Sequence, residues 1–218
     1  MDNPPINILS LFTGIGGLDI GVEAALEYLG HRTRTLGVCE RSGYPQACLM
    51  ARMEEAAMDP CPIFGDLADI PGERLSGLVD LVIGGPPCQP VSCAGKQKGA
   101  ADERYLWDET LELVEAIQPQ VVFFENVPGL LSGGHAALIV SRLDAAGYVV
   151  APPLRLRASD VGASHRRARV FIMAYREGGG FGVLRESPGS EGQPLCRGEG
   201  LAYRGGGRSQ GELEARAT

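Results

Sequence analysis

Short apolar segments alternate with longer segments of helical periodicity between residue 6 and about residue 175, and this alternation constrains the fold more than any other feature. The apolar segments predict strands at Ile6–Phe12, Thr35–Cys39, Pro62–Phe64, Asp80–Ile83, Val121–Glu125, Tyr148–Leu156 and Arg169–Ala174. The segments between them predict helices at Leu18–Leu29, Tyr44–Met58, Leu106–Ile117 and Ala136–Ala146. Alternating strands and helices predict an α/β fold in which a mostly parallel sheet carries helices on both faces.

The pattern stops after Tyr175, and the remaining residues are rich in glycine and poor in branched apolar side chains. Such a segment buries too little surface to offset the entropy lost on ordering. The sequence therefore predicts one folded domain over residues 1–175 and a disordered tail or linker over 176–218.

Cysteine and histidine usage argues against a structural metal site. The six cysteines show no C-x-x-C spacing and the three histidines are scattered, so we expect no zinc. The sequence has no signal peptide and no apolar run of membrane-spanning length, which predicts a cytoplasmic protein with reduced thiols.

The net charge of −7 does not by itself suggest a nucleic-acid partner. Positive charge is nevertheless grouped locally, and local patches matter more than the total for contact with phosphates. The grouped residues are Lys96, Lys98, Arg166, Arg167 and Arg169.

Cys88 lies in a loop directly after a predicted strand, in the segment Gly84-Gly85-Pro86-Pro87-Cys88-Gln89-Pro90. Consecutive prolines fix the backbone before the cysteine, and ligands of open α/β sheets bind beyond the carboxyl ends of strands. The position favours a nucleophilic thiol over the alternative, a buried structural cysteine.

A second set of candidate residues follows the first three strands. The turn Gly14-Ile15-Gly16-Gly17 leads into a helix, whose N-terminus favours an anionic group, although glycines there can also serve only a tight connection. Glu40 and Asp66 follow the next two strands, and either carboxylate taken alone is more often a solvated surface group. Together they predict a nucleotide-sized cradle at one sheet edge.

Glu125 ends the fifth predicted strand, directly after a uniformly apolar run. A carboxylate in this position is costly unless it has a partner or a function. Beside the cysteine loop it is placed to exchange a proton with a heterocycle, and the alternative is a capping acid in a loop.

These residues together resemble the DNA (cytosine-5)-methyltransferases. The segments that carry the resemblance occur in the order of the family and span nearly all of residues 6–175: Leu11-Phe12-Thr13-Gly14-Ile15-Gly16-Gly17, Cys39-Glu40, Gly65-Asp66, Gly85-Pro86-Pro87-Cys88-Gln89-Pro90, Glu125-Asn126-Val127 and His165-Arg166-Arg167-Ala168-Arg169. The resemblance implies a Rossmann-like class I methyltransferase fold. His165 departs from the glutamine usual in the family at that position.

The resemblance also implies S-adenosyl-L-methionine as methyl donor. The residues that would bind it are Phe12, Gly14, Gly16, Gly17, Glu40, Asp66, Pro86 and Leu106. Phe12 would pack on the adenine, the glycine turn would hold the methionine part, Glu40 would bind the ribose hydroxyls and Asp66 the adenine amino group.

Four catalytic roles follow from the same resemblance. Cys88 would add to C6 of a cytosine flipped out of the duplex, and Glu125 would share a proton with N3. Arg167 would hold the base O2, and Arg169 would orient the cysteine loop. Further contacts to the substrate would come from Gln89, Ser92, Asn126 and His165.

The implied partner is double-stranded DNA, yet no segment after Tyr175 resembles the target-recognition domain of the family. Three interpretations stay open: a truncated chain, one subunit that needs a second polypeptide carrying the recognition domain, or a donor-binding remnant with little activity. A relative that methylates cytosine in tRNA is a further alternative.

Overall fold

The computed structural model describes residues 4–87, 104–132 and 134–177, and the strands among them form one eight-stranded sheet. The strand order is β3-β2-β1-β4-β5-β8-β6, and β7 also pairs with β8. The strands are β1 (Ile6–Leu11), β2 (Thr33–Cys39), β3 (Ile63–Phe64), β4 (Leu81–Gly84), β5 (Val121–Asn126), β6 (Tyr148–Val150), β7 (Leu154–Arg157) and β8 (Ala168–Arg176).

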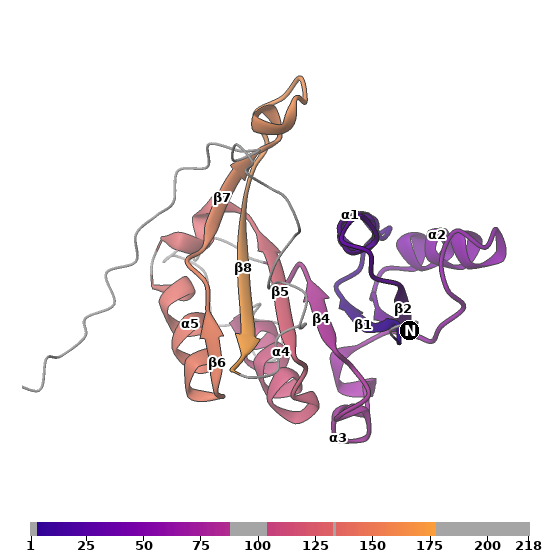
Figure 1. Ribbon diagram of the computed structural model, residues 1–218, viewed down its shortest axis with the longest axis horizontal. Coiled ribbons are helices and arrows are strands. Elements are labelled where there is room, and N and C mark those ends of the chain that lie inside the picture. Colours follow the sequence, from indigo (N-terminus) through magenta and orange to yellow (C-terminus); the bar gives the residue numbers. More distant parts are fainter. Residues whose placement is uncertain (1–3, 88–103, 133, 178–218) are drawn as a thin grey trace, which may run out of the picture.

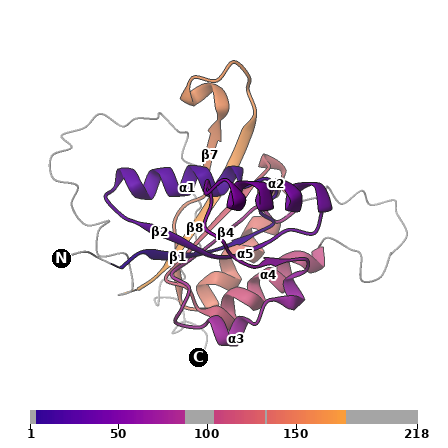
Figure 2. The same ribbon diagram turned by 90° about the vertical axis from the view of Figure 1, so that its right-hand side faces the viewer.

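Helices cover both faces of this sheet (Figure 2), with α1 and α2 on one face and α3, α4 and α5 on the other. The helices are α1 (Gly17–Tyr28), α2 (Gly43–Glu54), α3 (Gly72–Leu75), α4 (Arg104–Ile117) and α5 (His135–Ala145). Short 3₁₀ turns connect them: η1 (Leu67–Asp69), η2 (Pro128–Leu131) and η3 (Ala158–Val161). The predicted α/β fold is confirmed.

The two-residue period of the strands divides the apolar side chains between two cores. In β1, Ile8 joins a small core with Val22 of α1, whereas Leu9 joins the larger core beneath α4 and α5. Members of the larger core are Leu9, Leu11, Val82, Val114, Val122, Phe124, Leu143 and Ile172. Both faces of the central strands are therefore buried, as their continuous apolar runs require.

The strands from β3 to β5 are parallel, whereas β8 runs antiparallel to β5, β6 and β7. The prediction of a single strand over Tyr148–Leu156 is wrong, because β6 ends at Val150 and β7 begins at Leu154. Pro152 and Pro153 lie between them, and proline has no N–H to donate to a sheet ladder.

The break affects the shape of the molecule. Strand β7 pairs with residues 168–171 of β8, and residues 168 and 169 extend past the end of β5. Arg157 pairs with Ala168, while the last residue of β5, Asn126, pairs with Val170. The hairpin of β7, η3 and β8 consequently projects beyond the carboxyl ends of β4 and β5 (Figure 1).

Helix α2 ends earlier than predicted. It ends at Glu54, and Ala56 adopts a left-handed φ of 56°. This turn returns the chain to the sheet, where Met58 is buried in a third core, a small one, with Val38 and Leu49.

None of the described helices is both long and apolar enough to cross a membrane.

Candidate active site

The turn after β1 adopts a conformation that depends on glycine. Gly14 and Gly16 have φ values of 58° and 82°, in the left-handed region where other residues are strained. A Cβ at Gly16 would also lie 2.0 Å from Nη1 of Arg52, whereas a Cβ at Gly14 or Gly17 would enter open space. The turn thus presents backbone to an open side, just before α1 begins.

Glu40 lies beside this turn. Its Oε2 accepts a hydrogen bond from the backbone N–H of Gly14 at 2.8 Å, and its Oε1 accepts one from Ser42 at 2.7 Å. The backbone N–H of Glu40 donates to the carbonyl of Phe64, which ties the end of β2 to β3. The structure therefore brings the glycine turn and Glu40 together.

Asp66 lies next along the same sheet edge, where its Oδ1 accepts a hydrogen bond from the N–H of Ala68 at 3.1 Å and caps η1. Burial, and secondarily the negative charge of Asp66, raise the pKa of Glu109 in α4. Helix α4, to which Leu106 belongs, packs against η1, the turn that Asp66 caps. Phe12 is half-buried and packs against the larger core.

Glu125 and Arg169 form an ion pair at the end of β5, with 2.5 Å between Oε1 and Nε. Their side chains are 29% and 22% exposed, so the pair is partly shielded but still accessible. Arg169 also donates from Nη1 to the carbonyl of Ala168. A Cβ at Gly85 would lie 3.5 Å from the other carboxylate oxygen of Glu125, which shows that the loop after β4 passes directly beside this carboxylate.

Asn126 fixes the start of the cysteine loop. Its Nδ2 donates to the carbonyl of Pro86 at 2.7 Å, and its Oδ1 accepts from the N–H of Val127 at 2.9 Å. Asn126 is buried and uses both polar ends of its side chain within the protein. In the structure Asn126 holds the backbone two residues before Cys88, and its contact to substrate stays a prediction.

The other predicted residues are distributed differently. His165 and Arg167 are exposed on the hairpin that leads into β8, and Arg167 lies two residues before Arg169. Cys88, Gln89 and Ser92 lie outside the described residues, as do Lys96 and Lys98.

Cys39 is the last residue of β2 and directly precedes Glu40. Burial, then the charges of Asp66, Glu40 and Asp69, raise the pKa of its thiol to about 12. A thiol with this pKa stays protonated at neutral pH and is a poor nucleophile.

Two residues near the glycine turn were not predicted. Arg52 of α2 donates to the carbonyls of Ile15 and Gly16 at 3.1 and 3.5 Å. Asp19 of α1 is 2% exposed and neither of its carboxylate oxygens has a hydrogen-bond partner among the described residues. Burial raises its pKa. An acid one turn after a glycine-rich segment was a usable signal for Asp19, but no spacing pointed to Arg52.

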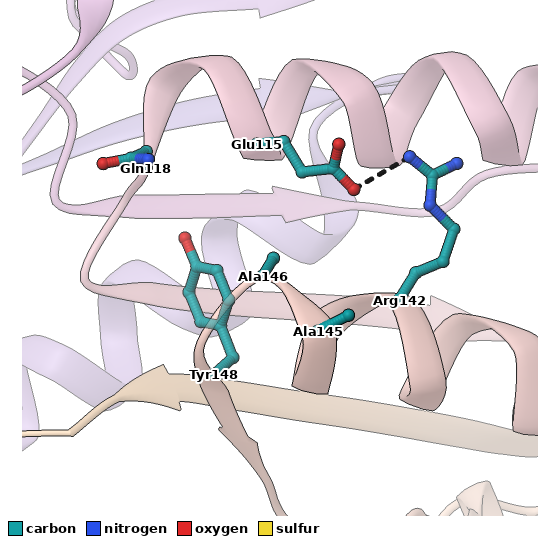
Figure 3. A pocket seen from close by; sticks show the side chains of 6 residues that line it. All are labelled: Glu115, Gln118, Arg142, Ala145, Ala146 and Tyr148. Atoms are coloured by element: carbon teal, nitrogen blue, oxygen red, sulfur yellow. Dashed lines mark hydrogen bonds and ion pairs between the residues drawn. The ribbon is translucent and has the colours of Figure 1, made fainter.

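A separate cavity of about 350 Å³ lies between the C-terminal ends of α4 and α5 and the start of β6 (Figure 3). Its lining residues are Glu115, Gln118, Arg142, Ala145, Ala146 and Tyr148. Arg142 forms an ion pair with Glu115 at 2.8 Å, and the Tyr148 hydroxyl donates to the carbonyl of Pro119. The cavity lies at the opposite end of the strands and contains none of the predicted site residues.

Solved structures with the same fold include a DNA modification methyltransferase encoded within an E. coli prophage, with a TM-score of 0.62 and 23% identity over 79% of this chain and 47% of that chain. DNMT2 of Spodoptera frugiperda gives a TM-score of 0.65 and 20% identity over 84% of this chain and 53% of that chain. These similarities establish the fold.

Sequence relatives are closer. The Type II methyltransferase M.NgoPII of Neisseria gonorrhoeae is 32% identical over 180 residues, which cover 79% of this chain and 49% of that protein. M.AplI of Arthrospira platensis is 34% identical over 172 residues, covering 78% of this chain and 45% of that protein. The chain thus spans about half the length of these relatives.

The model of one protein family, the C-5 cytosine-specific DNA methylases, matches residues 6–187. This range includes every strand that positions the glycine turn, Glu40 and the ion pair of Glu125 with Arg169. The chain therefore belongs to the C-5 cytosine-specific DNA methylase family.

Proposed function

We propose that this chain is the catalytic half of an enzyme that transfers a methyl group from S-adenosyl-L-methionine to C5 of cytosine in double-stranded DNA. One observation supports this most directly: Glu125, paired with Arg169, lies beside the loop that Asn126 holds by the Pro86 carbonyl. A carboxylate and the start of the loop that would carry the nucleophile therefore lie at the same sheet edge.

The residues at the first three strand ends fit the donor. The glycine turn has open space above Gly14 and Gly17, and Glu40 holds a carboxylate at its rim. Glu40, Asp66, Phe12, Pro86 and Leu106 would hold the nucleoside part, and the turn would hold the methionine part. When bound, S-adenosyl-L-methionine supplies the methyl group that C5 of the base accepts.

In the proposed mechanism, the Cys88 thiolate forms a bond to C6 of a cytosine flipped out of the duplex, and the C5–C6 π electrons become available at C5. Glu125 shares a proton with N3, and this proton neutralises the negative charge that develops on N3 as the thiolate adds. After methylation, a base removes the C5 proton, the C5–C6 double bond re-forms and the thiolate of Cys88 leaves.

Arg169 orients the cysteine loop and, through its ion pair, Glu125. Arg167 contacts the base O2, and the substrate contacts come from Gln89, Ser92, Asn126 and His165. Because the chain spans about half the length of its relatives, we include a second polypeptide that carries the target-recognition domain. Thiols stay reduced in the cytosol, where a reactive cysteine remains usable, so the proposed location is the cytoplasm.

Covalent trapping tests this function. The full chain is incubated with labelled donor and a duplex containing 5-fluorocytosine, which blocks loss of the C5 substituent and leaves the adduct on the protein. We expect a denaturant-stable, methylated protein–DNA adduct, which Cys88→Ala abolishes. Cys48→Ala serves as the matched control, because Cys48 lies on α2 away from Glu125 and should leave trapping unchanged.

Methyl transfer that persists in Cys88→Ala would refute the proposed nucleophile. Donor binding by calorimetry without any adduct would indicate a donor-binding remnant instead. Labelling of tRNA in place of DNA would assign the chain to the RNA-modifying alternative.

A further inference from the structure

The hairpin over residues 154–169 carries a concentration of positive charge in a chain whose net charge is −7. It contains five arginines and a single acidic residue, Asp160. The arginines are Arg155, Arg157, Arg166, Arg167 and Arg169. Since the rest of the chain is acidic, this local excess marks the hairpin as the surface best suited to an anionic partner.

The register of the hairpin sorts these arginines onto two faces. Arg155 pairs with Val170 and Arg157 with Ala168, so both side chains lie on one face of β7. Leu156 pairs with Arg169, which lies on the other face and contacts Glu125. Arg155 and Arg157 are two residues apart on a strand, or roughly 6.6 Å, a spacing at which long side chains reach successive phosphates of one nucleic-acid strand.

Arg155 and Arg157 are both exposed, and neither guanidinium is in an ion pair with another described residue. Among the described residues Asp160 forms no ion pair with either guanidinium, and its carboxylate accepts a hydrogen bond from the backbone N–H of Arg157 at 2.8 Å. By contrast, Arg142 contacts two carboxylates, those of Asp108 and Glu115. The two charges on β7 are therefore available to a partner.

The hairpin also lies at the sheet edge that carries the proposed base site. It projects past the carboxyl ends of β4 and β5 (Figure 1), the edge at which Glu125 and Pro86 lie. A duplex that presents a base to Glu125 would bring the phosphates flanking that base toward this projection. Arg169 at the root of the hairpin links it directly to the proposed base site.

We infer that Arg155 and Arg157 contact successive phosphates of the DNA backbone beside the target cytosine and position the duplex. The inference rests on the proposed function, and it adds a docking surface that the catalytic roles do not use. Phosphate contacts of this type fix register and orientation without reading sequence. They also release counterions, which makes their number measurable from the salt dependence of binding.

The test measures binding of the full 218-residue chain to a short fluorescein-labelled duplex by anisotropy, without donor, from about 50 to about 200 mM NaCl. In a plot of log binding constant against log salt concentration, Arg155→Gln or Arg157→Gln should each reduce the slope by about 0.9. The double variant should reduce it by about 1.8, and Arg→Lys at both sites should restore it because lysine also neutralises a phosphate.

Arg74→Gln on α3 is the control, since it removes an exposed arginine at the far end of the sheet and should leave the slope unchanged. The inference is overturned if the double variant keeps the original slope, or if the unaltered chain binds no duplex at about 50 mM salt. It is also overturned if the hairpin only pairs with a second copy of the chain through the exposed edge of β7 and binds no DNA. An arginine-dependent slope on an RNA hairpin but not on DNA overturns the choice of partner.

The salt dependence of DNA binding is measured without donor, so it does not depend on whether the chain transfers methyl groups. A chain that forms no adduct in the trapping assay but shows the arginine-dependent slope upholds the docking surface and fails only the proposed function.

Discussion

The side chain of Arg52, from α2, holds the glycine turn that follows β1. From α2 it donates to the carbonyls of Ile15 and Gly16, and to that of Ala57 at 3.4 Å. Its guanidinium occupies the space that a Cβ at Gly16 would need, so the glycine and the arginine require one another. Charge-assisted hydrogen bonds of this kind are worth more than neutral ones, about 1.5–3 kcal/mol each.

Replacing Arg52 with methionine should therefore loosen the donor-binding turn. We expect the Kd for S-adenosyl-L-methionine to rise roughly tenfold, equivalent to about 1.4 kcal/mol. Arg52→Lys should recover part of the affinity, because an ammonium can donate to one carbonyl. Isothermal titration calorimetry measures this, with the exposed Arg34→Met on β2 as control. Unchanged donor affinity in a folded Arg52→Met variant would contradict the assignment.

Asp19 gives a pH dependence whose sign follows from its burial. Its pKa is raised above the ordinary value of 3.8. At pH values between 3.8 and the folded pKa, the folded protein therefore binds more protons at this site than the unfolded chain. The unfolding free energy should consequently fall as the pH rises from 3.8 through the folded pKa. Asp19→Asn removes this loss and should stabilise the protein more at pH 7 than near pH 4.

Urea unfolding followed by circular dichroism at the two pH values measures the difference. Asp144→Asn on α5 is the control, because Asp144 is exposed and its change should be small at both pH values. An Asp19→Asn effect of equal size at acid and neutral pH would show that the buried charge is not the cause.

At the scale of elements, β4 carries the site because it packs tightly against β1 immediately before the cysteine loop. Gly84 pairs with Leu11, and a Cβ at Gly84 would lie 2.9 Å from the Leu11 carbonyl oxygen and 3.1 Å from the Leu11 Cβ. The obstruction is partly backbone, which cannot rotate away. Asn126 of β5 then holds the following loop through Pro86.

Gly84→Ala should push β4 away from β1 and lower the unfolding free energy by about 1–3 kcal/mol, the usual cost of inserting a methyl group into a packed core. Urea denaturation measures this change. Gly21→Ala is a matched control, because Gly21 lies in the exposed interior of α1 with open space at its Cβ, and alanine there should stabilise by about 0.5–1 kcal/mol. Equal stability of Gly84→Ala and the original chain would contradict the close approach.

At the scale of the whole molecule, one sheet edge collects residues from strands distant in sequence. The glycine turn follows β1, Glu40 follows β2 and Pro86 follows β4. Glu125 is the last but one residue of β5, and Arg169 belongs to β8. The parallel strands end at this edge because each returns through a helix on one face of the sheet, and β8 reaches it by running antiparallel. The positively charged hairpin extends from the same edge (Figure 1), while the cavity beside Arg142 lies at the other end.

The sequence by itself determined the alternation of strands and helices, the two-faced burial of the central strands and the residues that follow each strand. These depend on local patterns, because apolar periodicity and glycine-rich turns act over a few residues. The position of Glu40 beside the glycine turn was also predictable, since parallel strands align their carboxyl ends.

Only the tertiary structure decided which of these residues touch. The pairing of Glu125 with Arg169, the hold of Asn126 on Pro86 and the support of the turn by Arg52 join residues 44, 40 and 36 or 37 positions apart, read from the residue numbers. The split of Tyr148–Leu156 into two strands likewise depended on how β8 pairs, because prolines mark a break but not the direction taken after it. Such contacts arise from packing and register between distant segments, which no local pattern encodes.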